Sequence, residues 1–174
     1  MLQLRLISRI ALFSALVYVL ACATAFMPNV SLMFFVVFAA GFLWGFVPGS
    51  LVGLVGMGLF STFNPFGPAT APVTLAQMIG AAPSGLIGAA FGRSHWQQAG
   101  SAARILGLGL LGIGCAVLYF VPVSAADALV FGPFWPRFLG GFSFSLIAIV
   151  SNAVIFPLLF LPLARLYQRE HRAS

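Results

Sequence analysis

Apolar residues form six stretches along the chain, and short segments rich in proline, glycine and polar residues separate them. In lipid an isolated apolar segment must satisfy its own backbone hydrogen bonds, which favours helices, and a helix of about 20 residues crosses the hydrocarbon core. The pattern therefore predicts an all-α integral membrane protein, in which a single domain over 1–174 forms a bundle of six transmembrane helices. The predicted spans are 6–26, 30–46, 50–63, 72–91, 105–121 and 138–163.

The predicted breaks between these helices differ in length. Pro48 and Gly49 predict a very short turn between the second and third helices, whereas the run from Asn64 to Pro68 consists almost entirely of structure breakers. A longer loop is expected over 122–137. Six spans joined in this way place both termini on the same side of the membrane.

The first apolar stretch also has features of a secretory signal peptide. Two arginines precede it, residues 23–25 have the Ala-x-Ala spacing of a cleavage site, and Cys22 resembles a lipoprotein acceptor. Against cleavage, Ala11 and Ala15 lie four residues apart on one helical face, and small residues at that spacing let helices approach closely in lipid. We expect the stretch to be retained as the first helix.

Composition identifies the class of protein, and the arginines orient it. Only 6% of the residues are charged and 61% are hydrophobic, whereas a soluble domain has about 25% charged residues. The net charge of +6 therefore predicts membrane topology rather than nucleic-acid binding. Seven of the eight basic residues, all arginines, fall on one side of the six-helix arrangement, and Arg137 falls on the other. The positive-inside rule then predicts a multi-pass membrane protein with cytoplasmic N and C termini.

Several kinds of chemistry lack the residues they need. The chain contains no lysine, so it has no phosphate-binding loop for ATP. Its two acidic residues, Asp127 and Glu170, fall outside the predicted spans, which leaves no ionisable group for proton or sodium coupling. Neither clustered histidines nor acidic clusters are present. We therefore expect no enzyme activity, no cofactor and no metal.

A few polar and aromatic side chains lie where they can contact a small ligand near the outer face. The predicted ligand-binding residues are Asn64, Gln77, Trp135, Arg137, Ser145 and Asn152. Two alternatives stay open. Gln77, Ser145 and Asn152 can instead join helices through hydrogen bonds, and the outer aromatic residues can form an interfacial belt. Arg137 can extend to the headgroups or pair with Asp127, or it can bind an anionic ligand at the start of the last helix.

The sequence motifs "ALFSALV", "FAAGFLWGFVPGSLVGLVGMGLF" and "AQMIGAAPSGLIGAAFGR" in a six-helix layout resemble the substrate-binding S components of energy-coupling factor (ECF) vitamin transporters. The resemblance implies that a nutrient binds near the outer face, between the last three helices and under the loops joining helices 1–2 and 3–4. It also implies that Ala11 and Ala15 pack against a transmembrane coupling protein, while ATP-binding subunits supply the energy.

The function expected from this resemblance is the capture of a small, vitamin-like organic nutrient for uptake driven by ATP in partner subunits. The position of Arg137 predicts that this nutrient is anionic. Two other classes stay open. One is a structural six-helix membrane protein of the MreD-like cell-shape type, which would bind no solute. The other is a small facilitator, which would carry a flux without ATP.

Overall fold

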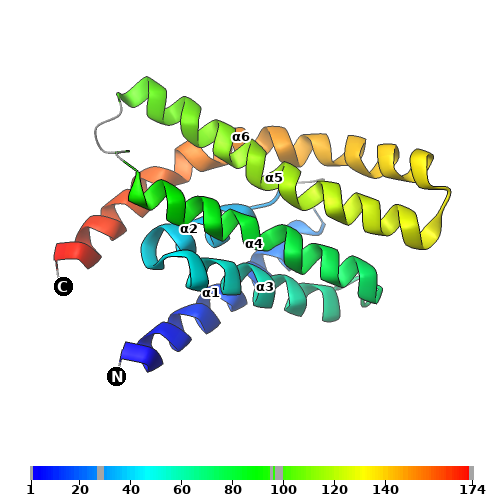
Figure 1. Ribbon diagram of the computed structural model, residues 1–174, viewed down its shortest axis with the longest axis horizontal. Helices are drawn as coiled ribbons and strands as arrows, with labels where there is room; N and C mark the ends of the chain where they lie inside the picture. Colours follow the sequence, from blue (N-terminus) through cyan, green and yellow to red (C-terminus); the bar gives the residue numbers. More distant parts are fainter. Residues whose placement is uncertain (1, 27–29, 95, 97–99, 173–174) are drawn as a thin grey trace.

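The computed structural model describes residues 2–26, 30–94, 96 and 100–172. Within them the chain is all-helical and contains no strand, which confirms the predicted all-α fold. Successive helices run in opposite directions, and both chain termini lie at the same end of the bundle (Figure 1). We call this the terminal end, and the opposite end the hairpin end. The helices are α1 (Leu2–Thr24), α2 (Met33–Trp44), α3 (Phe46–Thr62), α4 (Ala71–Arg93), α5 (Ser101–Phe131) and α6 (Phe134–Arg172).

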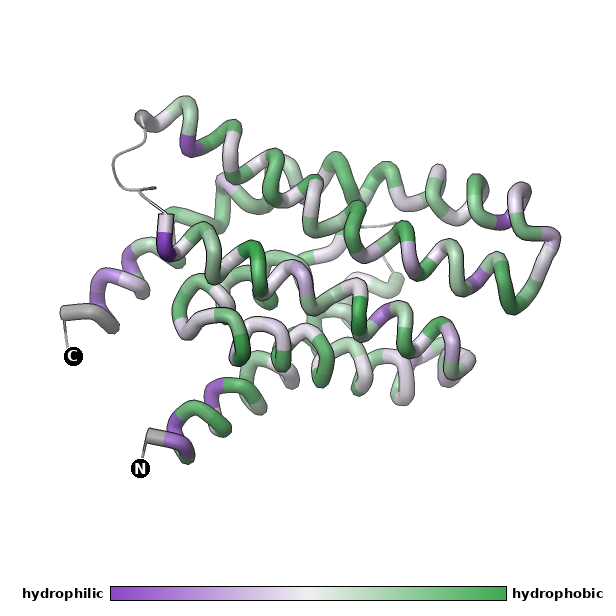
Figure 2. The backbone as a smooth tube through the Cα atoms, viewed as in Figure 1, coloured by the Kyte–Doolittle hydropathy of each residue, from purple (hydrophilic) through white to green (hydrophobic). Residues whose placement is uncertain are grey.

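Four of the helices, α1, α4, α5 and α6, are long and apolar enough to cross a membrane. Their outward surfaces carry exposed leucines such as Leu12, Leu106 and Leu158. Hydrophilic positions gather near the helix ends, and the middles of the helices are mostly hydrophobic (Figure 2). This distribution is that of a membrane-embedded protein. The number of crossings and the side on which the termini lie stay predictions.

The short helix α2 occupies the centre of the bundle and contacts each of the other five helices. Ten of its 12 residues, Met33 to Phe42, are buried. A helix that is apolar on every face is typical of a buried core position. At 1.5 Å per residue α2 is about 18 Å long, and α3 about 26 Å, so both are shorter than the hydrocarbon core of about 30 Å.

The turn between α2 and α3 lies at Gly45, and the predicted turn at Pro48 and Gly49 is wrong. Gly45 has a φ of +98°, a backbone conformation that glycine adopts without the strain other residues suffer. Pro48 and Gly49 lie within the first turns of α3 instead. Proline is tolerated there because the first backbone N–H groups of a helix have no acceptor within it.

At the terminal-end half of the bundle, α2, α3 and α4 touch backbone to backbone. A Cβ atom on Gly41 would overlap the carbonyl oxygen of Gly85, and one on Gly85 would overlap the backbone of Gly49. A Cβ on Gly88 would overlap the carbonyl oxygen of Phe38. Glycine is required at these positions because any side chain would push the helices apart. We call Gly41, Gly49, Gly85 and Gly88 the glycine seam.

The last two helices form a long hairpin, and the predicted loop over 122–137 is wrong. Helix α5 continues through Pro122 to Phe131, and α6 begins at Phe134. Three of the nine helical residues that follow Pro122 are alanine, which favours helix. Apolar helices also tolerate an internal proline when neighbouring groups satisfy the freed carbonyl. The hairpin extends past α3 and α4 at the hairpin end (Figure 1).

Candidate functional site

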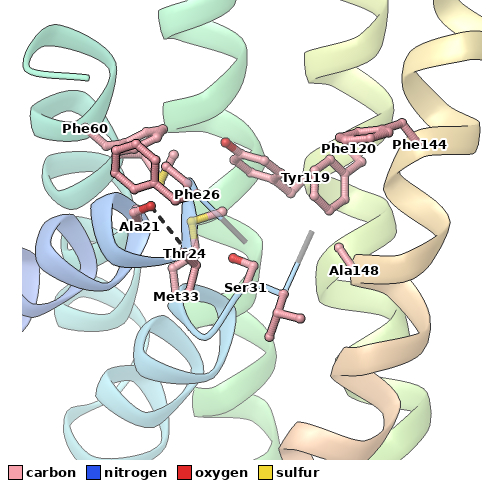
Figure 3. A pocket seen from close by; sticks show the side chains of 13 residues that line it. Ala21, Thr24, Phe26, Ser31, Met33, Phe60, Tyr119, Phe120, Phe144 and Ala148 are labelled. Atoms are coloured by element: carbon pink, nitrogen blue, oxygen red, sulfur yellow. Dashed lines mark hydrogen bonds between the residues drawn. The ribbon is translucent and has the colours of Figure 1, made fainter. Parts of the chain in front are cut away.

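A cavity of about 420 Å³ lies in the hairpin-end half of the bundle. Helices α1 and α6 both contact α2 but, in the part of the chain that the structure describes, they do not contact each other. The cavity occupies the space between them, with α3 and α5 completing its walls (Figure 3). Its described lining residues are Ala21, Thr24, Ala25, Phe26, Val30, Ser31, Met33, Met57, Phe60, Tyr119, Phe120, Phe144 and Ala148.

The inner wall of the cavity differs from its rim. Met33, Met57 and Ala148 are buried and form the inner wall, whereas Phe26 and Phe144 are exposed and lie at the rim. Methionine side chains are flexible and polarisable, so they adapt to irregular shapes. The volume and the mostly apolar lining are typical of a small-molecule site.

Three side-chain hydroxyls, those of Thr24, Ser31 and Tyr119, are the polar side-chain groups of the described lining. Thr24 donates to the carbonyl oxygen of Leu20 at 2.8 Å, within its own helix. Tyr119 is only 4% exposed, and its ring packs on Phe34 with 5.1 Å between centroids. Its hydroxyl has no hydrogen-bond partner among the described residues. The site therefore suits a mostly apolar molecule with at least one polar group.

None of the six predicted ligand-binding residues, all of which the structure describes, is among those lining the cavity. Asn64 closes the turn between α3 and α4, where its Oδ1 accepts a hydrogen bond from the Phe66 N–H at 2.9 Å. The Ser61 hydroxyl donates to the amide oxygen of Gln77, which joins α3 to α4. Both contacts are those of residues that hold the fold together.

Two of the four predicted residues on α6, Ser145 and Asn152, lie within four positions of a lining residue but do not line the cavity. Ser145 follows the rim residue Phe144, is buried and donates to the Gly141 carbonyl at 2.9 Å. Asn152 is fully buried, and its Nδ2 donates to the carbonyl oxygen of Ala148 at 2.8 Å. Its Oδ1 has no hydrogen-bond partner in the described part of the chain.

Arg137 and Trp135 lie near the tip of the hairpin. The Arg137 Nε donates to the Asp127 Oδ2 at 2.6 Å, and its guanidinium lies 4.8 Å from the centre of the Phe131 ring. Of the alternatives for Arg137, the structure therefore contains the pairing with Asp127, which is a residue of α5 rather than of a loop. Trp135 is 66% exposed and packs edge-on against Phe134.

The predicted docking residues Ala11 and Ala15 are exposed on α1. The side of α1 that packs into the bundle consists of Ser14, Val17 and Ala21, which are buried. Ala11 and Ala15 therefore lie on a surface of α1 that the described residues leave exposed. Their exposure is consistent with the predicted contact to another membrane protein.

The sequence reasoning missed Tyr119 and the methionines of the inner wall. Met33 and Met57 resemble every other apolar residue of a membrane helix, so no sequence signal distinguishes them. Tyr119 carried a usable signal, since a tyrosine inside an apolar helix needs a partner for its hydroxyl.

Comparisons with protein-family models, with curated proteins and with solved structures find no match for this chain. Among the described residues, which do not include His95 or the side chains of Glu170 and His171, no group of three histidine, cysteine or acidic residues is placed to hold a metal ion. The apolar cavity is therefore the candidate functional site.

Proposed function

We propose that this protein is the substrate-binding subunit of an ECF-type importer, which captures a small organic nutrient at the outer face of a bacterial membrane. Partner subunits, a transmembrane coupling protein and ATP-binding proteins, would then drive uptake. The observation that carries the proposal is the cavity between α1 and α6, which opens in the half of the bundle opposite the chain termini.

Two further features support a binding subunit that depends on partners. The chain has no lysine for a nucleotide-binding loop, and Asp127, an acidic residue of α5, is paired with Arg137 at the hairpin tip. The exposed face of Ala11 and Ala15 on α1 suits close packing against another transmembrane helix.

The binding part of the proposal is tested by filling the cavity. Ala25 lines it and is half-buried, whereas Ala23, two residues earlier, is exposed and is not among its lining residues. Purified protein is assayed by equilibrium dialysis with neutral and anionic ring compounds in matched pairs: nicotinamide and nicotinate, riboflavin and flavin mononucleotide, pyridoxine and pyridoxine phosphate. We expect Ala25→Trp to abolish the binding seen with the parent, and Ala23→Trp to preserve it. Equal binding by both variants would contradict the placement of the site.

The dependence on partners is tested separately. In host cells, Ala11→Trp is expected to abolish uptake of the compound that binds while leaving its affinity unchanged, because bulk on this face prevents close helix approach. Leu12→Trp, on a different exposed part of α1, is the matched control and should preserve both. Sustained accumulation by liposomes that contain this protein and no other would contradict the proposal.

A further inference from the structure

We infer that the molecule held in this cavity is uncharged and has a flat ring, and that the Tyr119 hydroxyl binds its polar edge. The inference rests on the proposed function, because it assigns a ligand class to the same cavity. It differs from the expectation of an anionic nutrient, which depended on Arg137.

The electrostatics of the cavity carry the first part of the inference. The described residues that line it include no charged side chain. An ion moved from water into an apolar site is strongly destabilised unless a partner of opposite charge is present. The guanidinium of Arg137, the arginine predicted for the outer side, is occupied by Asp127 at the hairpin tip and is not among the lining groups. An uncharged ligand avoids this unfavourable transfer of charge from water.

The arrangement of rings carries the second part. Phe26 and Phe60 lie on one side of the cavity, and Phe120 and Phe144 lie on the other (Figure 3). Aromatic rings favour offset-stacked and edge-to-face contacts with other rings. A flat molecule that enters between the two pairs can make such contacts with both, and Met33 and Met57 can adjust to its inner edge.

Tyr119 carries the third part. It is more than nine-tenths buried, lines the cavity, and its hydroxyl has no hydrogen-bond partner among the described residues. The hydroxyl oxygen itself is not fully buried, so it can be reached from the cavity. A hydroxyl in an apolar site is normally hydrogen-bonded, and one left without a partner is unfavourable. Figure 3 shows this hydroxyl above that of Ser31, in the space between the helices. A polar ring substituent between them would give Tyr119 the partner that it lacks.

The test compares affinities within the matched pairs, using the full-length protein in detergent or nanodiscs. The neutral member of at least one pair is expected to bind at least 10-fold more tightly than its anion, a ratio that corresponds to about 1.4 kcal/mol. Tyr119→Phe keeps the ring but removes the hydroxyl, and should lower the affinity for that compound roughly 2- to 10-fold. Tyr18→Phe is the control, since the Tyr18 hydroxyl donates instead to the Phe63 carbonyl at 3.4 Å.

Each other outcome is informative. Tighter binding of the anions, or an affinity that Tyr119→Phe leaves unchanged, would overturn the inference while the proposed function stands. Binding of no compound of either charge would count against both and would favour a structural role. Tyr119→Phe preserves the ring that packs on Phe34, so we expect its melting temperature to be unchanged. That measurement shows that the variant is folded.

Discussion

The two halves of the bundle use the same helices in opposite ways. Toward the terminal end, α2, α3 and α4 meet at the glycine seam, where no space remains for a side chain. Toward the hairpin end, α2 and α3 present Met33 and Met57 to a cavity. Lipid gives apolar helices no hydrophobic reason to associate, so close packing of small residues has to hold them together. The seam therefore holds α2, α3 and α4 together at the terminal end, and the cavity lies in the other half.

The most damaging substitutions should be those that add a side chain to the seam. A Cβ at position 85 would overlap backbone atoms of Gly49 and Ser50, so Gly85→Ala is expected to cost about 3 kcal/mol or more of unfolding free energy. Gly114 on α5 has open space around its Cβ position, and Gly114→Ala should be neutral or stabilising by up to about 1 kcal/mol. Unfolding in mixed detergent measures both. Equal stability of the two variants would mean that the helices do not touch as described.

A pair of phenylalanines compares the halves directly. Phe38 on α2 is fully buried and its ring packs on those of Phe35, Phe91 and Phe156. Phe60 is half-buried beside the cavity. Phe38→Ala is expected to lower the unfolding free energy by about 3–5 kcal/mol and Phe60→Ala by less than about 2 kcal/mol. Losses of the same size would show that the cavity half is packed as tightly as the other.

Asn152 tests how deep the polar part of the site extends. Its Oδ1 is buried without a partner in the described chain. Leucine at this position removes that unfavourable oxygen, and it also removes the hydrogen bond from the Asn152 Nδ2 to the Ala148 carbonyl. We expect Asn152→Leu to change the unfolding free energy by no more than about 1 kcal/mol and to leave the affinity for the tightest-binding compound unchanged. A loss of more than about 10-fold in affinity would confirm Asn152 as a ligand-binding residue.

The smallest effect is expected at the hairpin tip. The side chains of Arg137 and Asp127 are 44% and 36% exposed, and exposed ion pairs contribute only about 0.2–1 kcal/mol. A double-mutant cycle with Arg137→Ala and Asp127→Ala should give a coupling energy in that range, reduced by added salt. If Arg137→Ala alone weakens ligand binding by roughly 10-fold or more, the anionic ligand expected from the sequence is favoured over an uncharged one.

The sequence predicted the helices better than their ends and better than the site. Apolar stretches were sufficient to place six helices, because backbone hydrogen bonding in lipid permits little else. The turns predicted at Pro48 and Pro122 were wrong. Both prolines lie inside helices, and the turn between α2 and α3 depends on the φ of Gly45. A backbone dihedral angle depends on contacts between helices that no local pattern contains.

The site was predicted from polar residues, and the cavity is lined mostly by apolar ones. Gln77 joins α3 to α4, as the alternative interpretation of hydrogen bonds between helices had allowed, and Asn64 is used within the turn between them. A cavity is the space left where side chains fail to meet, so its position depends on how α1 and α6 diverge around α2. That divergence is a property of the whole bundle.

Hydrogen exchange of backbone amides, with and without the tightest-binding compound of the matched pairs, tests the division into two halves most directly. We expect the compound to slow exchange in segments that line the cavity, at residues 21–26, 30–33, 57–60, 119–120 and 144–148. Exchange at the glycine seam, in residues 41–49 and 85–88, should already be slow and should not change. Ligand-dependent protection at the seam, with none around the cavity, would contradict the account.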